Sequence, residues 1–206
     1  MISLFLDTAS HNMIVGIYKD TDELYFSIEE NNNQLSEKLL PAIKRAFENV
    51  DLSLADINRI YVVNGPGSFT GVRIGVAVAK TIAWALKKEI IPISELELMA
   101  STDIDEKNKL SMIDARRGYV YAGIYDKNLN VVIEDTYTAL DFVLSQIDQD
   151  AVMISDDSFE FETTIPKYNI PQIIEKHKND LPCNPHSLNP NYLKKTEAEE
   201  KRDSSC

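Results

Sequence analysis

The chain runs twice through one order of sequence patterns, and this repeat limits its fold more than any other feature. Each copy has three strand patterns, an amphipathic helix pattern and a fourth strand pattern. In the first copy they lie at residues 2–7, 13–18, 24–28, 35–50 and 59–63. In the second copy they lie at 110–114, 119–125, 131–136, 140–147 and 151–155. The repeat predicts an α/β protein with two related lobes.

A single sequence offset relates the two copies. Asp114 follows Asp7 by 107 positions, and Gly123-Ile124-Tyr125 follows Gly16-Ile17-Tyr18 by the same 107. Residues 1–103 are therefore expected to form the first lobe and residues 104–193 a shortened second lobe, with the polar stretch 102–109 at the boundary. The nearly all-polar residues 194–206 are expected to be a disordered tail.

The excess of acidic over basic residues limits the kinds of partner that this chain can bind directly. Among 206 residues, 33 are Asp or Glu and 21 are Lys or Arg, which gives a net charge of -12. A chain this acidic lacks the electrostatic attraction that drives unaided nucleic-acid binding, so any contact with RNA is expected to be indirect.

Two cysteines are too few for a disulfide framework. No basic leader is visible, and the apolar stretch 72–86 contains Arg73 and Lys80 and is too short for a bilayer. We expect a cytoplasmic protein without a membrane segment.

A glycine-rich loop precedes the most apolar helix pattern. Gly65 and Gly67 supply unusual backbone angles for a tight strand-to-helix turn, Pro66 stiffens it, and Ser68 or Thr70 can cap the helix. Free amides at a helix start also favour an anion. No Gly-Lys-Ser/Thr ending follows, which argues against a P-loop. A structural turn and an anion site both remain open, and the turn is favoured.

The helix pattern from 71 to 87 has little polar surface. Small residues recur every four positions and form a stripe, which we call the small-residue stripe: Gly71, Gly75, Ala79 and Ala83. Larger apolar residues form a second row beside it: Ile74, Val78, Ile82 and Leu86. Such a helix is expected to be buried on more than one side. The second cover is either the 35–50 helix of the same chain or a second polypeptide, and the sequence favours the second polypeptide.

Two aspartates end equivalent first strands. Asp7 and Asp114 stand where a bilobed nucleotide-binding fold places carboxylates, but glycine is missing two residues later, at Ala9 and Arg116. Backbone amides there cannot approach phosphates as glycine would allow, so ATP hydrolysis is not expected and Asp7 is expected to brace a turn. Arg116 and Arg117 either clamp an acidic ligand in a cleft between the lobes or belong to a solvated hairpin.

No other chemistry is indicated. His11, His177 and His186 are far apart in sequence and none forms a pair with metal-ligand spacing on one helix face, so no metal site is expected. No serine lies in a nucleophile-elbow pattern, and Cys183 lies among prolines. The sequence thus predicts no catalytic residue and no cofactor.

Several segments together resemble the TsaB (YeaZ) family. They are LFLDTAS near the start, LSEKLLPAI, GPGSFTGVRIGVAVAK, IDARRGYVYAGIY and the late PNYLKK. GPGSFTG followed by an Arg-Ile-Gly helix is the most specific of them. Many members have His-Ser-Glu where this chain has Leu35-Ser36-Glu37, and little resemblance is seen from 156 to 186.

The resemblance implies a duplicated RNase H-like fold of the actin and Hsp70 type (the ASKHA fold), with a mixed sheet in each lobe. It implies a non-catalytic subunit of the complex that forms threonylcarbamoyladenosine (t6A) on tRNA. Such a subunit forms a homodimer when alone, pairs with a TsaD-like transferase that carries the metal, and is joined by a TsaE-like ATPase. The implied contacts are Leu39, Ile43, Gly71, Gly75, Val78, Ala79, Ile82 and Ala83. The alternative is a stand-alone ASKHA-type ATPase or a glycoprotease-like hydrolase.

Overall fold

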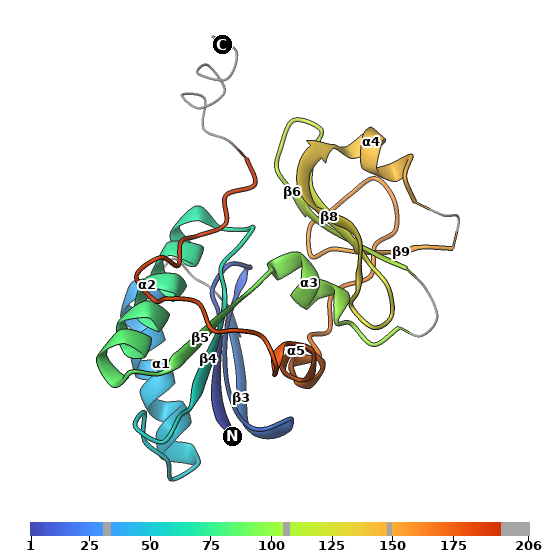
Figure 1. Ribbon diagram of the computed structural model, residues 1–206. Coiled ribbons are helices and arrows are strands. Elements are labelled where there is room, and N and C mark those ends of the chain that lie inside the picture. The colour runs from blue at the N-terminus through green and yellow to red at the C-terminus, as the bar shows by residue number, and fades with distance from the viewer. Residues whose placement is uncertain (31–33, 105–107, 148–149, 195–206) are drawn as a thin grey trace.

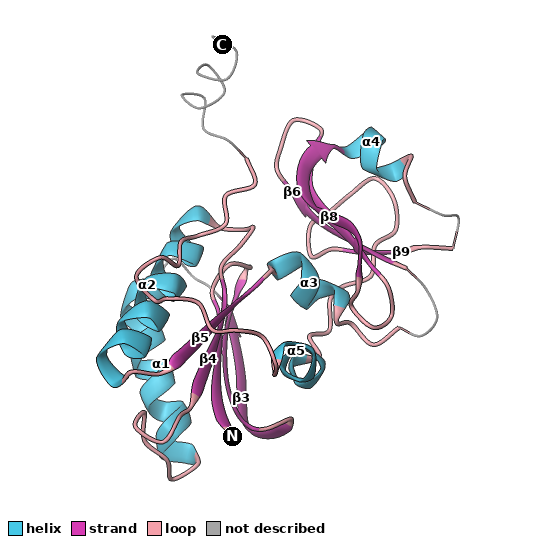
Figure 2. Ribbon diagram, in the orientation of Figure 1, coloured by secondary structure: helices cyan, strands magenta, loops and turns pink. Residues whose placement is uncertain are grey.

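The computed structural model describes residues 1–30, 34–104, 108–147 and 150–194, and it has two lobes, each built on one sheet (Figures 1 and 2). The α/β fold with two mixed sheets is confirmed. The expected disordered tail lies almost wholly outside the described residues, as does part of the expected lobe boundary.

The first lobe contains a five-stranded sheet in the order β3-β2-β1-β4-β5. Its strands are β1 (Ile2–Asp7), β2 (Asn12–Lys19), β3 (Asp22–Glu30), β4 (Arg59–Val63) and β5 (Glu89–Ile93). β1 pairs antiparallel with β2 and parallel with β4. β1 and β4 are almost continuously apolar because both of their faces are covered, whereas the edge strand β3 alternates between more and less exposed residues.

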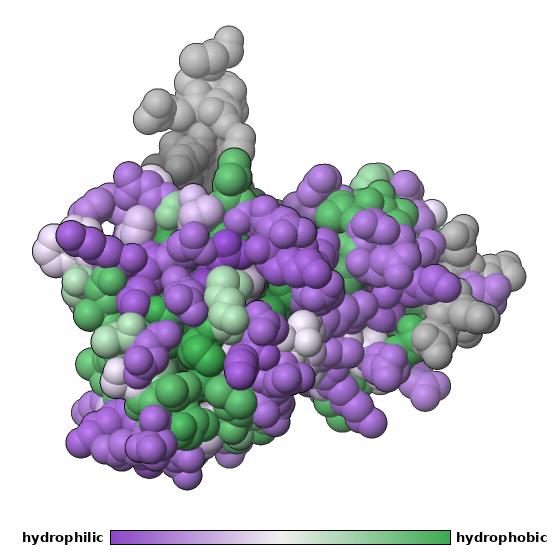
Figure 3. Space-filling view, turned by 60° about the horizontal axis from the view of Figure 1, so that its bottom comes forward, coloured by the Kyte–Doolittle hydropathy of each residue, from purple (hydrophilic) through white to green (hydrophobic). Residues whose placement is uncertain are grey.

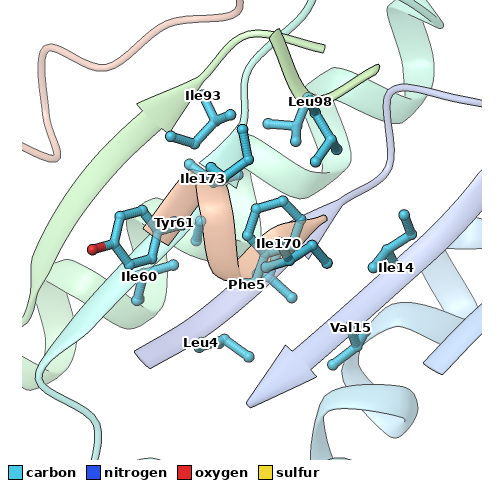
Figure 4. Close-up of a cluster of buried hydrophobic side chains, with 14 of the residues drawn as sticks. Leu4, Phe5, Ile14, Val15, Ile60, Tyr61, Ile93, Leu98, Ile170 and Ile173 are labelled. Carbon is cyan, nitrogen blue, oxygen red and sulfur yellow. The ribbon is translucent and has the colours of Figure 1, made fainter. Parts of the chain in front are cut away.

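Helices cover both faces of this sheet. α1 (Leu35–Asn49) and α2 (Phe69–Leu86) lie side by side on one face, and α5 (Ile170–His177) lies on the other (Figure 1). α1 buries an apolar stripe that includes Leu39 and Ile43, as its period predicts. On the opposite face, Ile170 and Ile173 pack in one core with Phe5 and Tyr61 of the sheet (Figure 4).

The second lobe repeats the plan in a smaller form. Its sheet has the order β8-β7-β6-β9, with β6 (Lys109–Asp114), β7 (Tyr119–Tyr125), β8 (Val131–Ala139), β9 (Val152–Ile154) and the short helix α4 (Leu140–Leu144). β6 is antiparallel to β7 and parallel to β9, as β1 is to β2 and β4. A small separate core of buried side chains belongs to this lobe.

The two copies do not match residue for residue. Gly16 pairs with Phe5, but Gly123 pairs with Ser111 and not with Met112, the residue 107 positions after Phe5. The connection between the two strands of the second hairpin is therefore one residue shorter than in the first hairpin. As a result, Gly123 and Asp114 lie on opposite faces of their sheet, whereas Gly16 and Asp7 lie on the same face of theirs. The cause is a tighter turn at 116–118, where three successive residues have φ values of 69°, 58° and 76°.

Polar contacts hold α3 (Glu95–Ala100) against α5 and against the second lobe. Glu97 accepts hydrogen bonds from Lys176 and from Nε2 of His177, the latter at 3.0 Å. Burial alone would raise the pKa of Glu97, but these two partners hold that pKa below its usual value. From the second lobe, Asp135 accepts hydrogen bonds from Ser94, at the start of α3, and from Tyr125. All six residues of α3 are buried.

The end of the chain returns to the first lobe, which changes the expected division at 103/104. After α5, the segment from Cys183 to Tyr192, here called the return strap, crosses the first lobe (Figure 1). Cys183 donates its backbone N–H to Ile90, and Lys80 of α2 donates to the carbonyl of Leu188 at 2.6 Å. Residues 170–192 were expected in the second lobe, but their buried apolar side chains belong to the hydrophobic core of the first lobe.

α2 is longer than the apolar stretch considered in the sequence. It begins at Phe69 and has 18 residues, so by length and composition alone it could cross a membrane, contrary to the expectation that it is too short. In the structure it packs against β1, β4 and β5. Arg73 donates to the Tyr192 hydroxyl at 2.8 Å, and Lys80 holds the return strap. Both polar side chains are thus used within the fold.

The small-residue stripe is buried within this chain, and its two glycines meet Thr8 just after β1, which corrects its assignment as a partner contact. Gly71, Gly75, Ala79 and Ala83 are all buried. A Cβ atom at Gly71 would lie 2.0 Å from the backbone oxygen of Thr8, and a Cβ at Gly75 would lie 2.2 Å from Thr8 Oγ1. The glycines are therefore needed so that α2 can approach the end of β1.

Other residues implied as partner contacts are also covered. Leu39 and Ile43 are buried beneath α1, and Ile82 is nearly buried. Val78 is half-buried at the edge of the core. The apolar side chains that α1 and α2 leave exposed are different ones: Leu40, Phe69, Trp84 and Leu86. Helix periodicity gives the direction of a stripe, but it does not say which surface the stripe meets.

The contact between Thr8 and Gly75 can be tested by a double-mutant cycle. We expect Gly75→Ala to lower the free energy of unfolding by about 1–2 kcal/mol, because overpacking outweighs the roughly 1 kcal/mol gain in helix propensity. In a Thr8→Ala background the same change should cost much less, with a coupling energy above about 0.5 kcal/mol. Denaturant unfolding of the four proteins measures this. Additive effects would contradict the packing described.

Candidate functional site

A pocket of about 240 Å³ lies where the two lobes meet. Its first-lobe walls come from the turn after β1, the glycine loop and α3, and its second-lobe walls come from β6, β7 and the segment after β9. The lining residues are Ala9, Ser10, His11, Gly67, Ser68, Glu95, Met99, Met112, Ile113, Asp114, Arg116, Tyr121, Asp156 and Asp157. The volume is below the ~300–1,000 Å³ of pockets that hold larger ligands.

Asp7 lies fully buried behind this pocket, at the end of β1. Its Oδ1 accepts the backbone N–H of Ala9 at 2.7 Å and its Oδ2 accepts the hydroxyl of Ser10 at 3.2 Å. Asp7 thus braces the turn, as the sequence predicts. Burial raises the pKa of Asp7 to about 6, against the lowering effect of these hydrogen bonds.

Glu95, the first residue of α3, is the second buried carboxyl. Only 1% of the residue is exposed, and no donor among the described residues reaches its Oε2. Burial, followed by the charges of Asp7 and Asp156, raises the pKa of Glu95 well above its usual value. Asp7 and Glu95 are neighbouring buried carboxyl groups, and the negative charge of one favours the protonated form of the other.

Asp114 and Arg116 lie at the mouth of the pocket on the second lobe. Asp114 Oδ1 accepts the backbone N–H of Arg116 at 2.8 Å, and its Oδ2 pairs with the Arg116 guanidinium at 3.1 Å. Arg116 lines the pocket, but its side chain is 85% exposed. Arg117 is exposed and is absent from the pocket lining. Of the expected pair, only Arg116 is therefore at the pocket.

The glycine loop is occupied by the chain itself. The Ser68 N–H donates to the carbonyl of Ala9 at 2.7 Å, and the Ser68 hydroxyl accepts the Gly71 N–H and so caps α2, while Thr70 is exposed. A Cβ at Gly67 would lie 2.4 Å from the Ala9 oxygen, and one at Gly65 would lie 2.8 Å from the Asn191 oxygen. Pro66 is buried next to Gly65. These contacts favour the structural turn over the anion site.

Sequence reasoning missed Glu95, Asp156 and Asp157. Asp157 Oδ2 accepts the backbone N–H of Asp114 at 2.8 Å, and the Tyr168 hydroxyl donates to Asp156 at 3.4 Å. Glu95 follows the helix-capping Ser94, where an acidic residue is ordinary, so only long-range packing identifies it as buried. Among the described residues, no three His, Cys, Asp or Glu side chains are grouped so that they could hold a metal ion.

Comparison with known proteins identifies the family. A family model described as TsaD, tRNA N6-adenosine threonylcarbamoyltransferase, matches residues 29–181. The chain belongs to this family. The tRNA threonylcarbamoyladenosine biosynthesis protein TsaB of Bacillus subtilis is 36% identical over 126 residues, covering 61% of this chain and 55% of the relative. The TsaB protein of Escherichia coli is 33% identical over 131 residues, covering 62% and 56%.

These relatives confirm the resemblance to TsaB that the sequence motifs indicated. The match spans little more than half the length of each of them. YeaZ from Pseudomonas aeruginosa has a TM-score of 0.80 and 20% identity, covering 93% of this chain and 99% of that chain. At that identity the similarity concerns the fold alone, and it agrees with the duplicated RNase H-like architecture.

The buried carboxyl pair should make stability depend on pH. Because folding raises the pKa values of Asp7 and Glu95, the folded chain binds more protons than the unfolded chain between about pH 4 and 6. The stability that the two protonated carboxyl groups contribute is fully present below their unfolded-state pKa values of 3.8 and 4.5. It is lost as the pH rises through their folded-state pKa values. Glu95→Gln should therefore reduce the fall in melting temperature between pH 4.5 and 7.5.

The matched control is Glu48→Gln, which changes an exposed glutamate on α1. It should leave the pH dependence as in the wild type. If Glu95→Gln and Glu48→Gln give the same curve, Glu95 is ionised in the folded chain and the description of the carboxyl pair is incorrect.

Proposed function

We propose that this chain is a non-catalytic subunit in the formation of t6A on tRNA, and that it acts by binding and supporting a TsaD-like transferase. The observation that carries the proposal is the similarity to the TsaB biosynthesis proteins of B. subtilis and E. coli. In this proposal the protein is cytoplasmic, forms a homodimer when alone, works together with a TsaE-like ATPase and meets tRNA only through its partners.

The site supports a role without catalysis. Both Asp7 carboxylate oxygens are used by the turn that follows it, and Asp114 is used by Arg116. Ala9 and Arg116 stand where glycine would let backbone amides approach phosphates, and the pocket of about 240 Å³ is small for a nucleotide. The Asp7 and Asp114 carboxylates are thus bound by other groups of this chain. A protein of this fold that hydrolyses a nucleotide would need these carboxylates free.

The exposed apolar surface supports a protein partner. Figure 3 shows apolar side chains gathered on the surface of the first lobe. Leu40 on α1 is 56% exposed. Arg45 of α1 points to Glu29 of β3, so Leu40, on the other side of the helix, lies toward α2. Ile74 and Val78 of α2 are only partly buried. We assign the partner surface to this pair of helices, with Leu40, Ile74 and Val78 in place of the buried stripe.

The partner surface is tested by substituting its most exposed member. Leu40→Glu should weaken binding to the TsaD-like protein of the same organism at least tenfold, about 1.4 kcal/mol, because a carboxylate would be buried against apolar surface. The matched control is Phe142→Glu on α4, which is similarly exposed on the second lobe. Titration calorimetry on the purified proteins measures the affinity. Equal affinity for both variants would place the partner elsewhere.

The stand-alone enzyme alternative is tested separately. The purified chain should hydrolyse ATP no faster than the buffer background, with or without Mg²⁺. Turnover that requires a metal and disappears in Asp7→Asn, while Asp141→Asn on α4 retains it, would defeat the non-catalytic proposal. Asp141 belongs to the short helix at the far end of the second lobe and is exposed, so it controls for the loss of one negative charge.

A further inference from the structure

The pocket between the lobes has an acidic wall, and its buried carboxyl group lacks a basic partner. Glu95 lines it, is 1% exposed and has an Oε2 atom without a donor among the described residues. Asp156 also lines it, and its charge acts on Glu95. A buried carboxyl group without a donor is costly, and such groups normally have a partner. The fold maintains this arrangement next to an open space.

The basic side chains in the pocket lining already have partners. These side chains are His11 and Arg116. His11 pairs with Asp157 at 3.5 Å, and Arg116 pairs with Asp114 at 3.1 Å. Their side chains are 75% and 85% exposed, so both project toward solvent. Neither is paired with Glu95 in the structure. A cation from outside the chain would therefore meet an unmatched carboxyl group.

The remaining lining selects the kind of cation. Met99, Met112, Ile113 and Tyr121 contribute apolar surface to the same pocket. A bare metal ion would gain nothing from this surface, and no three metal-ligating side chains of the described residues are grouped to hold one. An anion would be repelled by the carboxyl groups. A ligand with a cationic group on a short apolar chain could contact both the carboxyl groups and the apolar lining, and it would fit within about 240 Å³.

We propose that this pocket binds a protonated primary amine on a short alkyl chain, with its ammonium group held by Glu95 and its chain against Met99 and Met112. Two sources share this chemistry: a free alkylamine and the side chain of a lysine from another protein. The proposal does not depend on the proposed function, because it follows from the lining of the pocket alone.

Binding should release a proton. An ammonium group favours the ionised form of Glu95, so its binding displaces the proton that burial favours on this carboxyl group. The titratable and charged groups around Glu95 and the pocket are Asp7, His11, Asp114, Arg116, Tyr121, Asp156, Asp157 and Tyr168. Affinity should consequently rise between pH 5.5 and 7.5 while the alkylamine itself stays protonated.

The experiment uses the full chain with n-butylamine as the probe and 1-butanol as its neutral counterpart. In titration calorimetry at pH 7.5, n-butylamine should bind and 1-butanol should bind at least tenfold more weakly. Glu95→Gln should reduce the affinity for n-butylamine at least tenfold, and Glu48→Gln should leave it unchanged. Nα-acetyl-L-lysine methylamide replaces n-butylamine in a parallel arm: tighter binding of the lysine compound points to a protein lysine, and tighter binding of n-butylamine to a free amine.

A second measurement locates the probe without any substitution. The chain has five methionines, and with ¹³C-labelled methyl groups n-butylamine should shift the signals of Met99 and Met112 but leave those of Met1, Met13 and Met153 unchanged. The proposal is overturned if these two signals do not move, if 1-butanol binds as well as n-butylamine, or if Glu95→Gln binds as well as the wild type. Mg²⁺ that displaces n-butylamine and shifts the same signals would also overturn it.

Discussion

The close approach of α2 to the end of β1 is the contact on which the rest of the structure depends. Thr8 donates its hydroxyl to the carbonyl of Gly71 at 2.7 Å, and Ala9 accepts the N–H of Ser68. With no side chains on Gly67, Gly71 and Gly75, the helix can press against this turn. The turn after β1 also surrounds Asp7 and shields its carboxylate from water. The glycine loop, whose composition is typical of an anion site, is thus used to hold the end of a strand.

The candidate site is a consequence of how the lobes meet. α3 is buried along its whole length between them, which brings Glu95 beside Asp7 and Glu97 beside α5. The two acidic residues of α3 differ in their partners. Lys176 and His177 compensate the charge of Glu97, whereas Glu95 has only another carboxyl group. One carboxyl therefore fastens α3 to α5, and the other lines the pocket between the lobes.

Local patterns predicted most of the fold. The strands and the long helices begin and end within a few residues of their expected positions, because apolar period and turn residues act over short distances. Asp7, Asp114, Arg116 and Arg117 were expected near one cleft because equivalent strand ends meet between duplicated lobes, and Arg117 does not line the pocket. Glu95 and the cover of the small-residue stripe were missed. Both depend on which distant segment packs against a helix, and helix periodicity does not contain that information.

The position of α5 and the return strap has a consequence for how the protein is made. Ile170 and Ile173 complete the core around Phe5 and Tyr61, and Lys80 and Arg73 bind the segment that follows. While the ribosome is still synthesising the second lobe, one face of the first sheet lacks its cover. The first lobe therefore reaches its final packing only after residue 192 has emerged, and a gene fragment that ends at the lobe boundary encodes an incomplete folding unit.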